Sequence, residues 1–419
     1  MSRITLGLLL LWGVSVGAAV DSGNRNDARF VGNAECVVCH QEQAEAWQGS
    51  HHRHAMHEAT PEFVRGNFND VSYDRSGQVF RFYRKDGQYC VETVGPDGQV
   101  ARFTVKYTFG WVPLQQYLLD MGDGKLQALD VAWDTEQNRW FAIDPETSPS
   151  AGDWLHWTGG AMTWNTMCAD CHSTNIQQNY DAATDSFGTT WSTINVGCEA
   201  CHGPGRAHVE LMASGVDVDE TRIRADLQLT TVASATETVA GCAPCHSLRE
   251  KLTENYGHDG NWLDHFNPQL PLPPAYFSDG QIRQEVYVYG SFLQSRMYSE
   301  GVDCNDCHDP HSLGLKAGLD NNGLCLQCHE QDYATRKHHF HPLDSSGSQC
   351  IECHMPGRLY MGVDFRRDHS FRAPRPDLSR THDVPNACAN CHEDRTAEWA
   401  ANKVVEWYGE RRTGHFSDV

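Results

Sequence analysis

A five-residue unit, Cys-x-x-Cys-His, occurs eight times in this 419-residue chain and constrains its fold more than any other feature. The copies, numbered motif 1 to motif 8 in chain order, begin at Cys36, Cys168, Cys198, Cys242, Cys304, Cys325, Cys350 and Cys388. A lone CxxC also occurs in zinc sites and redox dithiols, but neither chemistry requires a histidine directly after the second cysteine. Here every copy has that histidine, which is typical of covalent haem c attachment.

Each motif assigns roles to three side chains. Two thiols become thioethers on one edge of the porphyrin, and the following histidine binds the iron. The predicted attachment residues are Cys36, Cys39, Cys168, Cys171, Cys198, Cys201, Cys242, Cys245, Cys304, Cys307, Cys325, Cys328, Cys350, Cys353, Cys388 and Cys391. The predicted proximal ligands are His40, His172, His202, His246, His308, His329, His354 and His392. We therefore expect eight covalently bound haem c groups with iron, with zinc or disulfides as the alternative.

The chain has 23 histidines, so fifteen remain after the eight proximal ligands are subtracted. Those that we expect to bind a second axial position are His52, His208, His311, His339, His369 and His382. His208 follows a Gly-Pro-Gly turn after motif 3. His311 lies too close to His308 to bind the same iron easily, so a neighbouring haem is favoured. In KHHFHP, His338 and His341 are alternatives to His339. A haem with two histidine ligands exchanges electrons but has no open position for a substrate.

The first residues, MSRITLGLLLLWGVSVGAAV, are typical of a secretory signal peptide over residues 1–19. An uncleaved membrane anchor is the alternative, but the apolar run is short for a membrane span. After cleavage we expect no transmembrane segment, and a periplasmic or secreted, extracellular location. The formal net charge is −22 and there is no basic run, so nucleic acid is an unfavourable partner.

The motifs divide the chain into unequal parts. We expect a first haem segment at 29–61, a β-rich insertion without haem at 62–150, and a seven-haem core with a C-terminal helix at 151–419. In the insertion, VFRFYRKDGQYCVETV alternates in polarity and carries an Asp86-Gly87 turn. Cys90 lies in one of these strands, where a buried inert thiol is favoured over a reactive one. The predicted fold is mainly α, with long loops wrapped around a multihaem core, plus a small antiparallel β module between haem 1 and haem 2.

Several longer segments resemble a known family. They are WQGSHHRHAM, HWTGGAMTWNTMCADCHSTN, INVGCEACHGPGRAH and YGSFLQSRMYSEGVDCNDCHDPH. The family is that of exported multihaem cytochromes c whose larger members continue into tetratricopeptide repeats. More distantly, the chain is similar to the tetrahaem cytochrome partner of hydroxylamine oxidoreductase. The resemblance implies distal ligand roles for His52, His208 and His311. The sequence has no such repeats after Trp407, and it lacks the CxxCK motif of the ammonia-forming nitrite reductases.

These observations favour an octahaem electron-transfer protein over a substrate-converting enzyme. It would pass electrons through closely packed, mostly bis-histidine haems, and its partners would be redox proteins. One alternative is an oxidoreductase that acts on a small nitrogen or sulfur oxyanion at one open haem, with Arg296 and Tyr298 nearby. The other is a subunit that assembles with copies of itself into an oligomer or a haem filament.

Overall fold

The computed structural model describes residues 29–224, 227–229, 234–254, 256, 258, 260–284 and 287–410. The expected signal peptide lies outside these described residues. Among the residues that are described, no helix has both the length and the apolar character that crossing a membrane requires.

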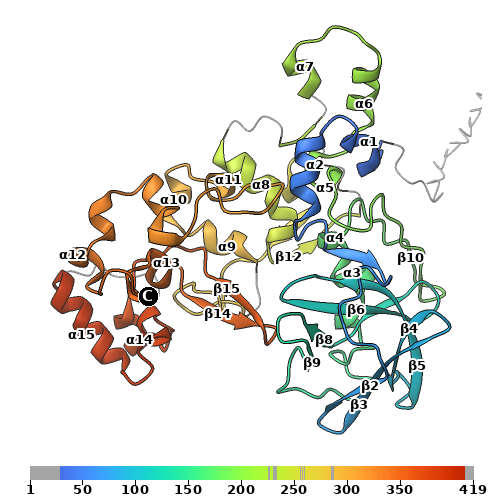
Figure 1. The fold of residues 1–419 in the computed structure, drawn as a ribbon, viewed down its shortest axis with the longest axis horizontal. Helices are drawn as coiled ribbons and strands as arrows, with labels where there is room; N and C mark the ends of the chain where they lie inside the picture. Colours follow the sequence, from blue (N-terminus) through green and yellow to red (C-terminus); the bar gives the residue numbers. More distant parts are fainter. Residues whose placement is uncertain are drawn as a thin grey trace, which may run out of the picture.

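A nine-stranded antiparallel sheet occupies one end of the molecule (Figure 1). Its strands are β1 (Met56–Glu58), β2 (Val71–Arg75), β3 (Gln78–Lys85), β4 (Gln88–Val94), β5 (Val100–Phe109), β6 (Leu114–Asp120), β7 (Leu126–Ala128), β8 (Val131–Asp134) and β9 (Arg139–Ala142). The order is β2-β3-β4-β5-β6-β8-β9, with β1 paired to β5 and β7 paired to β6. Asp86 and Gly87 join β3 to β4 with φ angles of 52° and 79°. Positive φ at both positions is the hairpin geometry that an Asp-Gly pair favours.

The sheet curls so that its distant strands share one apolar core. Phe82 of β3 stacks on Trp140 of β9, with ring centroids 3.5 Å apart. Tyr117 of β6 and Trp157, which follows the sheet, are fully buried in the same cluster. The thiol of Cys90 is also buried, 1% exposed, and this burial raises its pKa. The sheet is therefore much larger than the small module expected from the sequence.

The prediction of a mainly α fold is wrong, since the described residues are 31% helix and 21% strand. The helices are α1 (Asn33–Val37), α2 (Gln41–Gln48), α3 (Trp164–Met167), α4 (Ala169–His172), α5 (Glu199–His202), α6 (Arg206–Ala213), α7 (Glu220–Arg224), α8 (Ala235–His246), α9 (Val288–Phe292), α10 (Arg296–Ser299), α11 (Cys304–Cys307), α12 (Arg336–His339), α13 (Cys350–His354), α14 (Pro376–His382) and α15 (Ala397–Tyr408). Most of these helices span only one or two turns. The last of them, α15, is the C-terminal helix and begins at Ala397.

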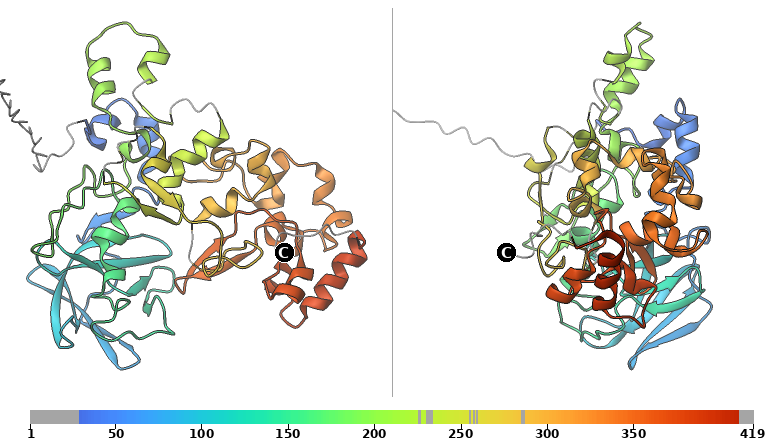
Figure 2. Two further views of the ribbon diagram at one scale, coloured as in Figure 1. Left: turned by 180° about the vertical axis from the view of Figure 1, so that it is seen from behind. Right: turned by 90° about the vertical axis from the view of Figure 1, so that its left-hand side faces the viewer.

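Three small hairpins lie among these helices. They are β10 (Tyr180–Asp181) with β11 (Ser186–Phe187), β12 (Arg249–Lys251) with β13 (Phe266–Pro268), and β14 (Gly357–Tyr360) with β15 (Asp364–Arg367). The views in Figure 1 and Figure 2 place α12, α14 and α15 at the end of the molecule opposite the large sheet. The haem motifs are distributed along the connection between these two ends.

Candidate haem-binding sites

Each CxxCH motif folds into a single helical turn. The backbone N–H of the histidine donates to the carbonyl oxygen of the first cysteine, at 3.0 Å in motif 1, 3.0 Å in motif 3 and 2.9 Å in motif 5. Residues three and four apart in a helix lie on one face. The turn therefore directs both thiols and the imidazole to one side of the backbone, as covalent haem attachment requires.

Five motif histidines face a second histidine at a nearly constant separation. The ring centroids are 6.2 Å apart for His40 and His208, His246 and His52, His202 and His311, and His354 and His338, and 6.1 Å apart for His392 and His341. A metal–imidazole bond of roughly 2 Å, plus roughly 1 Å from each ring nitrogen to its centroid, separates two rings on one iron by roughly 6 Å. The spacing of these pairs therefore fits an iron atom between the two imidazoles.

In several of these histidines, a hydrogen bond at Nδ1 leaves the other ring nitrogen, Nε2, available to bind a metal. His202 Nδ1 lies 2.9 Å from the Gln228 carbonyl oxygen, and His354 Nδ1 lies 2.8 Å from that of Arg372. His208 Nδ1 lies 3.0 Å from the carbonyl oxygen of Ile223. A carbonyl oxygen only accepts, so Nδ1 carries the proton and Nε2 keeps a lone pair for a metal.

Burial keeps the candidate ligands neutral. It lowers the pKa of His52 to about 4 and that of His172 to about 4. Burial also lowers the pKa of His202, His246 and His354. Metal binding requires the deprotonated imidazole, so this environment favours the form of histidine that binds iron.

The remaining motif histidines are His172, His308 and His329. His308 lies close enough to His369 that its charge would lower the pKa of His369. The Nδ1 of His369 lies 3.0 Å from the Arg367 carbonyl oxygen, which leaves Nε2 available. His369 is therefore the candidate partner of His308. His382 lies on α14, and its role as a distal ligand stays a prediction.

His172 has a different environment. The ring packed against it is that of Phe109, with centroids 4.3 Å apart. The histidines that lower its pKa electrostatically are His246 and His52, which already face each other. Within the described ranges, no histidine faces His172 at the spacing of the five pairs. The Nδ1 atom of His172 is buried without a hydrogen-bond partner.

Contacts between cysteines show which motifs are neighbours. Pairs of thiols close enough to shift each other's pKa join motifs 1 and 3 (Cys36 and Cys198), 2 and 4 (Cys171 and Cys245), 4 and 5 (Cys242 and Cys304), and 6 and 7 (Cys325 and Cys350). Electrostatic effects on pKa connect motifs 3 and 4 (Cys201 with Cys242 and Cys245), 5 and 6 (Cys307 with Cys325 and Cys328), and 7 and 8 (Cys353 with Cys388 and Cys391). The order of neighbours is 1-3-4-5-6-7-8, with motif 2 beside motif 4.

Buried polar side chains hold neighbouring motifs together. The carboxylate of Glu199, 2% exposed, accepts from the backbone N–H groups of Val31, Gly32 and Gly205 at 2.9, 2.7 and 2.8 Å. Asn33 accepts from the N–H of Cys198 at 2.9 Å. These bonds fix motif 1 against motif 3.

An equivalent bond joins motif 6 to motif 7. Asn322 Oδ1 accepts from the N–H of Cys350 at 2.8 Å. Asn322 precedes the first cysteine of motif 6 by the same three positions that separate Asn33 from Cys36. The two motif pairs are thus built in the same way.

The large sheet packs against motif 2. Cys168 contacts an apolar cluster that contains Met56, Tyr107 and Leu118 from β1, β5 and β6, together with Trp164 of α3. The indole nitrogen of Trp164 is buried without a partner. The sheet therefore covers the site where haem 2 would be attached.

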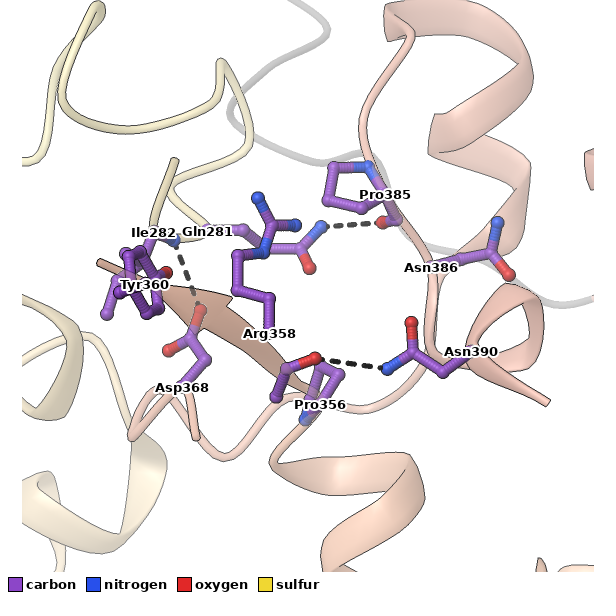
Figure 3. Close-up of a pocket in the computed structure, with 10 residues that line it drawn as sticks. Gln281, Ile282, Pro356, Arg358, Tyr360, Asp368, Pro385, Asn386 and Asn390 are labelled. Carbon is purple, nitrogen blue, oxygen red and sulfur yellow. Dashed lines mark hydrogen bonds between the residues drawn. The ribbon is translucent and has the colours of Figure 1, made fainter. Parts of the chain in front are cut away.

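A polar pocket lies beside motif 8 (Figure 3). It is lined by Gln281, Ile282, Pro356, Gly357, Arg358, Tyr360, Asp368, Pro385, Asn386 and Asn390. Asn390 belongs to motif 8, and Pro356 is the second residue after motif 7. Among the described residues, no carboxylate pairs with Arg358, whose guanidinium lies 5.1 Å from the Phe277 ring centroid. The pocket therefore offers a cation to a carboxylate such as a haem propionate.

Other predicted residues lie elsewhere. The structure brings His338 and His341, rather than His339, to motif histidines; the left-handed φ of 59° at Phe340 turns the chain between them. Arg296 is 90% exposed in its side chain and pairs with Glu300, and Tyr298 lies on the same short helix, α10. In the sequence, these two histidines are marked only by their spacing of three residues, His338-x-x-His341.

Comparisons with known proteins concern the haem motifs and the fold. The family model "Cytochrome c554 and c-prime" matches residues 35–79 and 145–203, and the model "Doubled CXXCH motif" matches residues 297–334. No curated protein matches the sequence.

Two solved structures are similar over 90% of this chain. The outer cell wall cytochrome OcwA has 16% sequence identity and a TM-score of 0.62, and the match covers 87% of its chain. The undecahaem cytochrome from the S-layer of Carboxydothermus ferrireducens has 16% identity and a TM-score of 0.44, and the match covers 59% of its chain. The likeness to OcwA concerns the fold. Together with the CxxCH motifs, the family matches show that the chain is a multihaem c-type cytochrome.

Proposed function

We propose that this protein is an octahaem electron conduit. The main support is that motifs 1, 3, 4, 5, 6, 7 and 8 are neighbours in this order. In five of the eight motifs the histidine faces a second histidine, with ring centroids 6.1–6.2 Å apart. Bound haem c supplies a reversible one-electron couple at its iron. The chain provides the order of the sites and their axial ligands.

The order of the motifs gives the proposed route. Electrons travel between a site at motif 1 and a site at motif 8, through motifs 3 to 7. Motif 2 is a side branch at motif 4, covered by the large sheet. Redox proteins at the two ends are the proposed partners.

The proposed location is outside the cytoplasm, in the periplasm or beyond it. The expected signal peptide supports this, as does the resemblance in fold to a cytochrome described as an outer cell wall protein. Assembly of copies into a filament stays a prediction, without a contact surface assigned to it.

The proposed route is tested by removing the haem of motif 4, which lies on the route, and in a separate variant the haem of motif 2, which lies on the branch. In a Glu45→Cys, Glu406→Cys protein, exposed thiols on α2 and α15 would anchor the two ends to electrodes. We expect Cys242→Ala with Cys245→Ala, which removes haem 4, to reduce the conductance toward that of haem-free protein. Cys168→Ala with Cys171→Ala removes the branch haem by the same kind of change and should leave the conductance nearly unchanged.

Intact mass of each loaded protein is measured first and should show eight haems in the parent and seven in each deletion variant. Equal losses of conductance in both variants would contradict the branched order. No loss in either would show that the current does not pass through motif 4.

A second candidate function follows from His172. The five paired histidines and His369 leave His172 and His329 without an assigned partner, and His172 is the less exposed of these two. An open iron position there would bind a small ligand such as nitrite or hydroxylamine, and the conduit would supply the electrons.

Low-temperature EPR of the oxidised loaded protein tests this function, together with optical titration by nitrite and hydroxylamine. A high-spin signal of one haem that changes with ligand, and is absent after Cys168→Ala with Cys171→Ala, supports an open haem 2. A spectrum with low-spin signals alone, unchanged by either ligand, would rule out this second function. It would not contradict the proposed electron conduit.

A further inference from the structure

Motifs 2 and 4 meet beside a short strand that carries two cations. This strand, β12 (Arg249–Lys251), pairs with β13 so that Lys251 lies opposite Phe266. Cys171 and Cys245 lie close enough at the same place that each thiol shifts the pKa of the other. The branch of the proposed conduit therefore has charged residues at its junction.

Arg249 touches both motifs. Its Nε donates to the Pro244 carbonyl oxygen of motif 4 at 2.6 Å, and its Nη2 lies 3.7 Å from the Cys171 sulfur of motif 2. The guanidinium lies 4.0 Å from the ring centroid of Phe266, and the side chain is 9% exposed. A single buried side chain thus fixes the two motifs relative to each other.

The nearby charges do not fully cancel that of Arg249. Asp170 of motif 2 lies 2.9 Å from Lys251 Nζ but 3.8 Å from Arg249 Nη1. Glu254, 3.3 Å from Lys251, has a side chain that is 54% exposed, so water screens it. Because Lys251 is the closer partner of Asp170, a net positive charge remains beside the Cys171 sulfur.

We propose that Arg249 is a positioning residue that raises the reduction potential of haem 2, so that the branch collects electrons from the main route. This inference rests on the proposed octahaem conduit. Reduction lowers the charge at the iron by one unit, so a nearby positive charge stabilises the reduced form. A buried charge is weakly screened, so its effect exceeds that of a surface charge.

The test is a redox titration of the fully loaded protein, followed by visible and EPR spectra. For Arg249→Gln we expect the reduced-to-oxidised ratio of one haem, at a fixed potential, to fall about tenfold, which is about 59 mV for a one-electron couple. Asp170→Asn should shift the same haem in the opposite direction, because it removes the negative charge. Arg249→Lys should restore most of the parent potential, because it keeps the positive charge.

The matched control is Arg84→Gln, since Arg84 also lies over an aromatic ring, 5.0 Å from that of Tyr89, but on an exposed part of β3. This control should leave every potential unchanged. Arg249→Gln should also cause no shift when Cys168→Ala and Cys171→Ala have removed haem 2.

Two results would overturn the inference: no shift in Arg249→Gln, or a shift that persists without haem 2. A structural role alone would predict that Asp170→Asn and Arg249→Gln shift the potential in the same direction. Intact mass separates the two proposals. A parent protein without haem at motif 2 would overturn the conduit itself, whereas a full haem complement with unshifted potentials overturns only the role of Arg249.

Discussion

At the scale of single residues, the separation of histidine rings is the most informative quantity. His208, 168 positions after His40 in the sequence, faces it at 6.2 Å. Its Nδ1 is held by the Ile223 carbonyl oxygen, which orients Nε2 toward His40. The pair has the geometry of two axial ligands on one iron.

Replacing His208 by alanine should leave haem 1 with one protein ligand. We expect one additional high-spin haem in the EPR spectrum, and its return to low spin when imidazole is added, because imidazole can occupy the vacated space. The matched control is His51→Ala, since His51 is exposed and lies next to a candidate ligand. A low-spin spectrum in His208→Ala identical to that of the parent would contradict the assignment.

His57 predicts a pH dependence of stability. It is 3% exposed, and burial together with the neighbouring Arg53 lowers its pKa to about 3. Arg53 Nη1 lies 3.0 Å from its Nδ1, and its Nε2 lies 3.0 Å from His54 Nδ1. The folded protein therefore keeps His57 neutral where the unfolded chain, with an ordinary pKa, takes up a proton.

The sign follows from this difference in proton uptake. Stability is lost as the pH falls from about 6.5 toward 3, and the part due to His57 is about 1 kcal/mol between pH 7 and pH 5.5. Thermal unfolding of His57→Gln should therefore depend less on pH in this window than that of the parent. Parallel curves for the two proteins would show that His57 does not titrate on unfolding.

At the scale of secondary-structure elements, the helices that carry the motifs are too short to be stable alone. Their positions depend on side chains such as Glu199, which bonds to three backbone N–H groups across motifs 1 and 3. Covalent haem and these bonds take the place of long helices. This is why a chain with many helical motifs is not a mainly α protein.

Glu199→Gln should destabilise the protein by about 2 kcal/mol, because a buried charged acceptor of several N–H groups is replaced by an amide with one acceptor oxygen. A lower Tm should accompany disturbance of the His40 and His208 pair, seen as partial high-spin character in EPR. The control is Asp97→Asn, which alters an exposed carboxylate that accepts from the N–H of Gln99. Equal changes in Tm for both variants would argue against the role of Glu199 as a clamp.

At the scale of the whole molecule, charge determines which reagents approach the sites. The formal net charge is −22, and the haem propionates make it more negative. The field of an acidic protein attracts cations and repels anions, and dissolved salt screens both effects.

The reduced protein should therefore transfer electrons to a hexaammine metal cation fastest at low ionic strength. Transfer to ferricyanide, an anion, should become faster as salt is added. Stopped-flow oxidation at several salt concentrations measures both rates. The same salt dependence for the two oxidants would show that the overall charge does not control access to the haems.

The extent of the large sheet also belongs to the whole molecule. The alternation of polar and apolar residues and the Asp86-Gly87 turn predicted antiparallel strands. This pattern identifies each strand locally and does not show which distant strands belong to the same sheet. The stacking of Phe82 on Trp140 joins strands far apart in the sequence and makes one curled sheet from them. Such packing depends on long-range contacts, which local propensity does not contain.

The sequence by itself determined the chemistry of attachment. The two cysteines and the histidine of each motif lie within five consecutive residues, so a single helical turn places all three, and no distant contact is needed. The histidines that face five of the motif histidines, the neighbour of each motif and the cover over motif 2 come from other segments of the chain. Only tertiary packing decided them, because an axial pair forms where two separate segments bring their imidazoles to the spacing of one iron. His338 and His341 illustrate the difference, since the sequence offered three histidines and the turn at Phe340 determined which two face a motif.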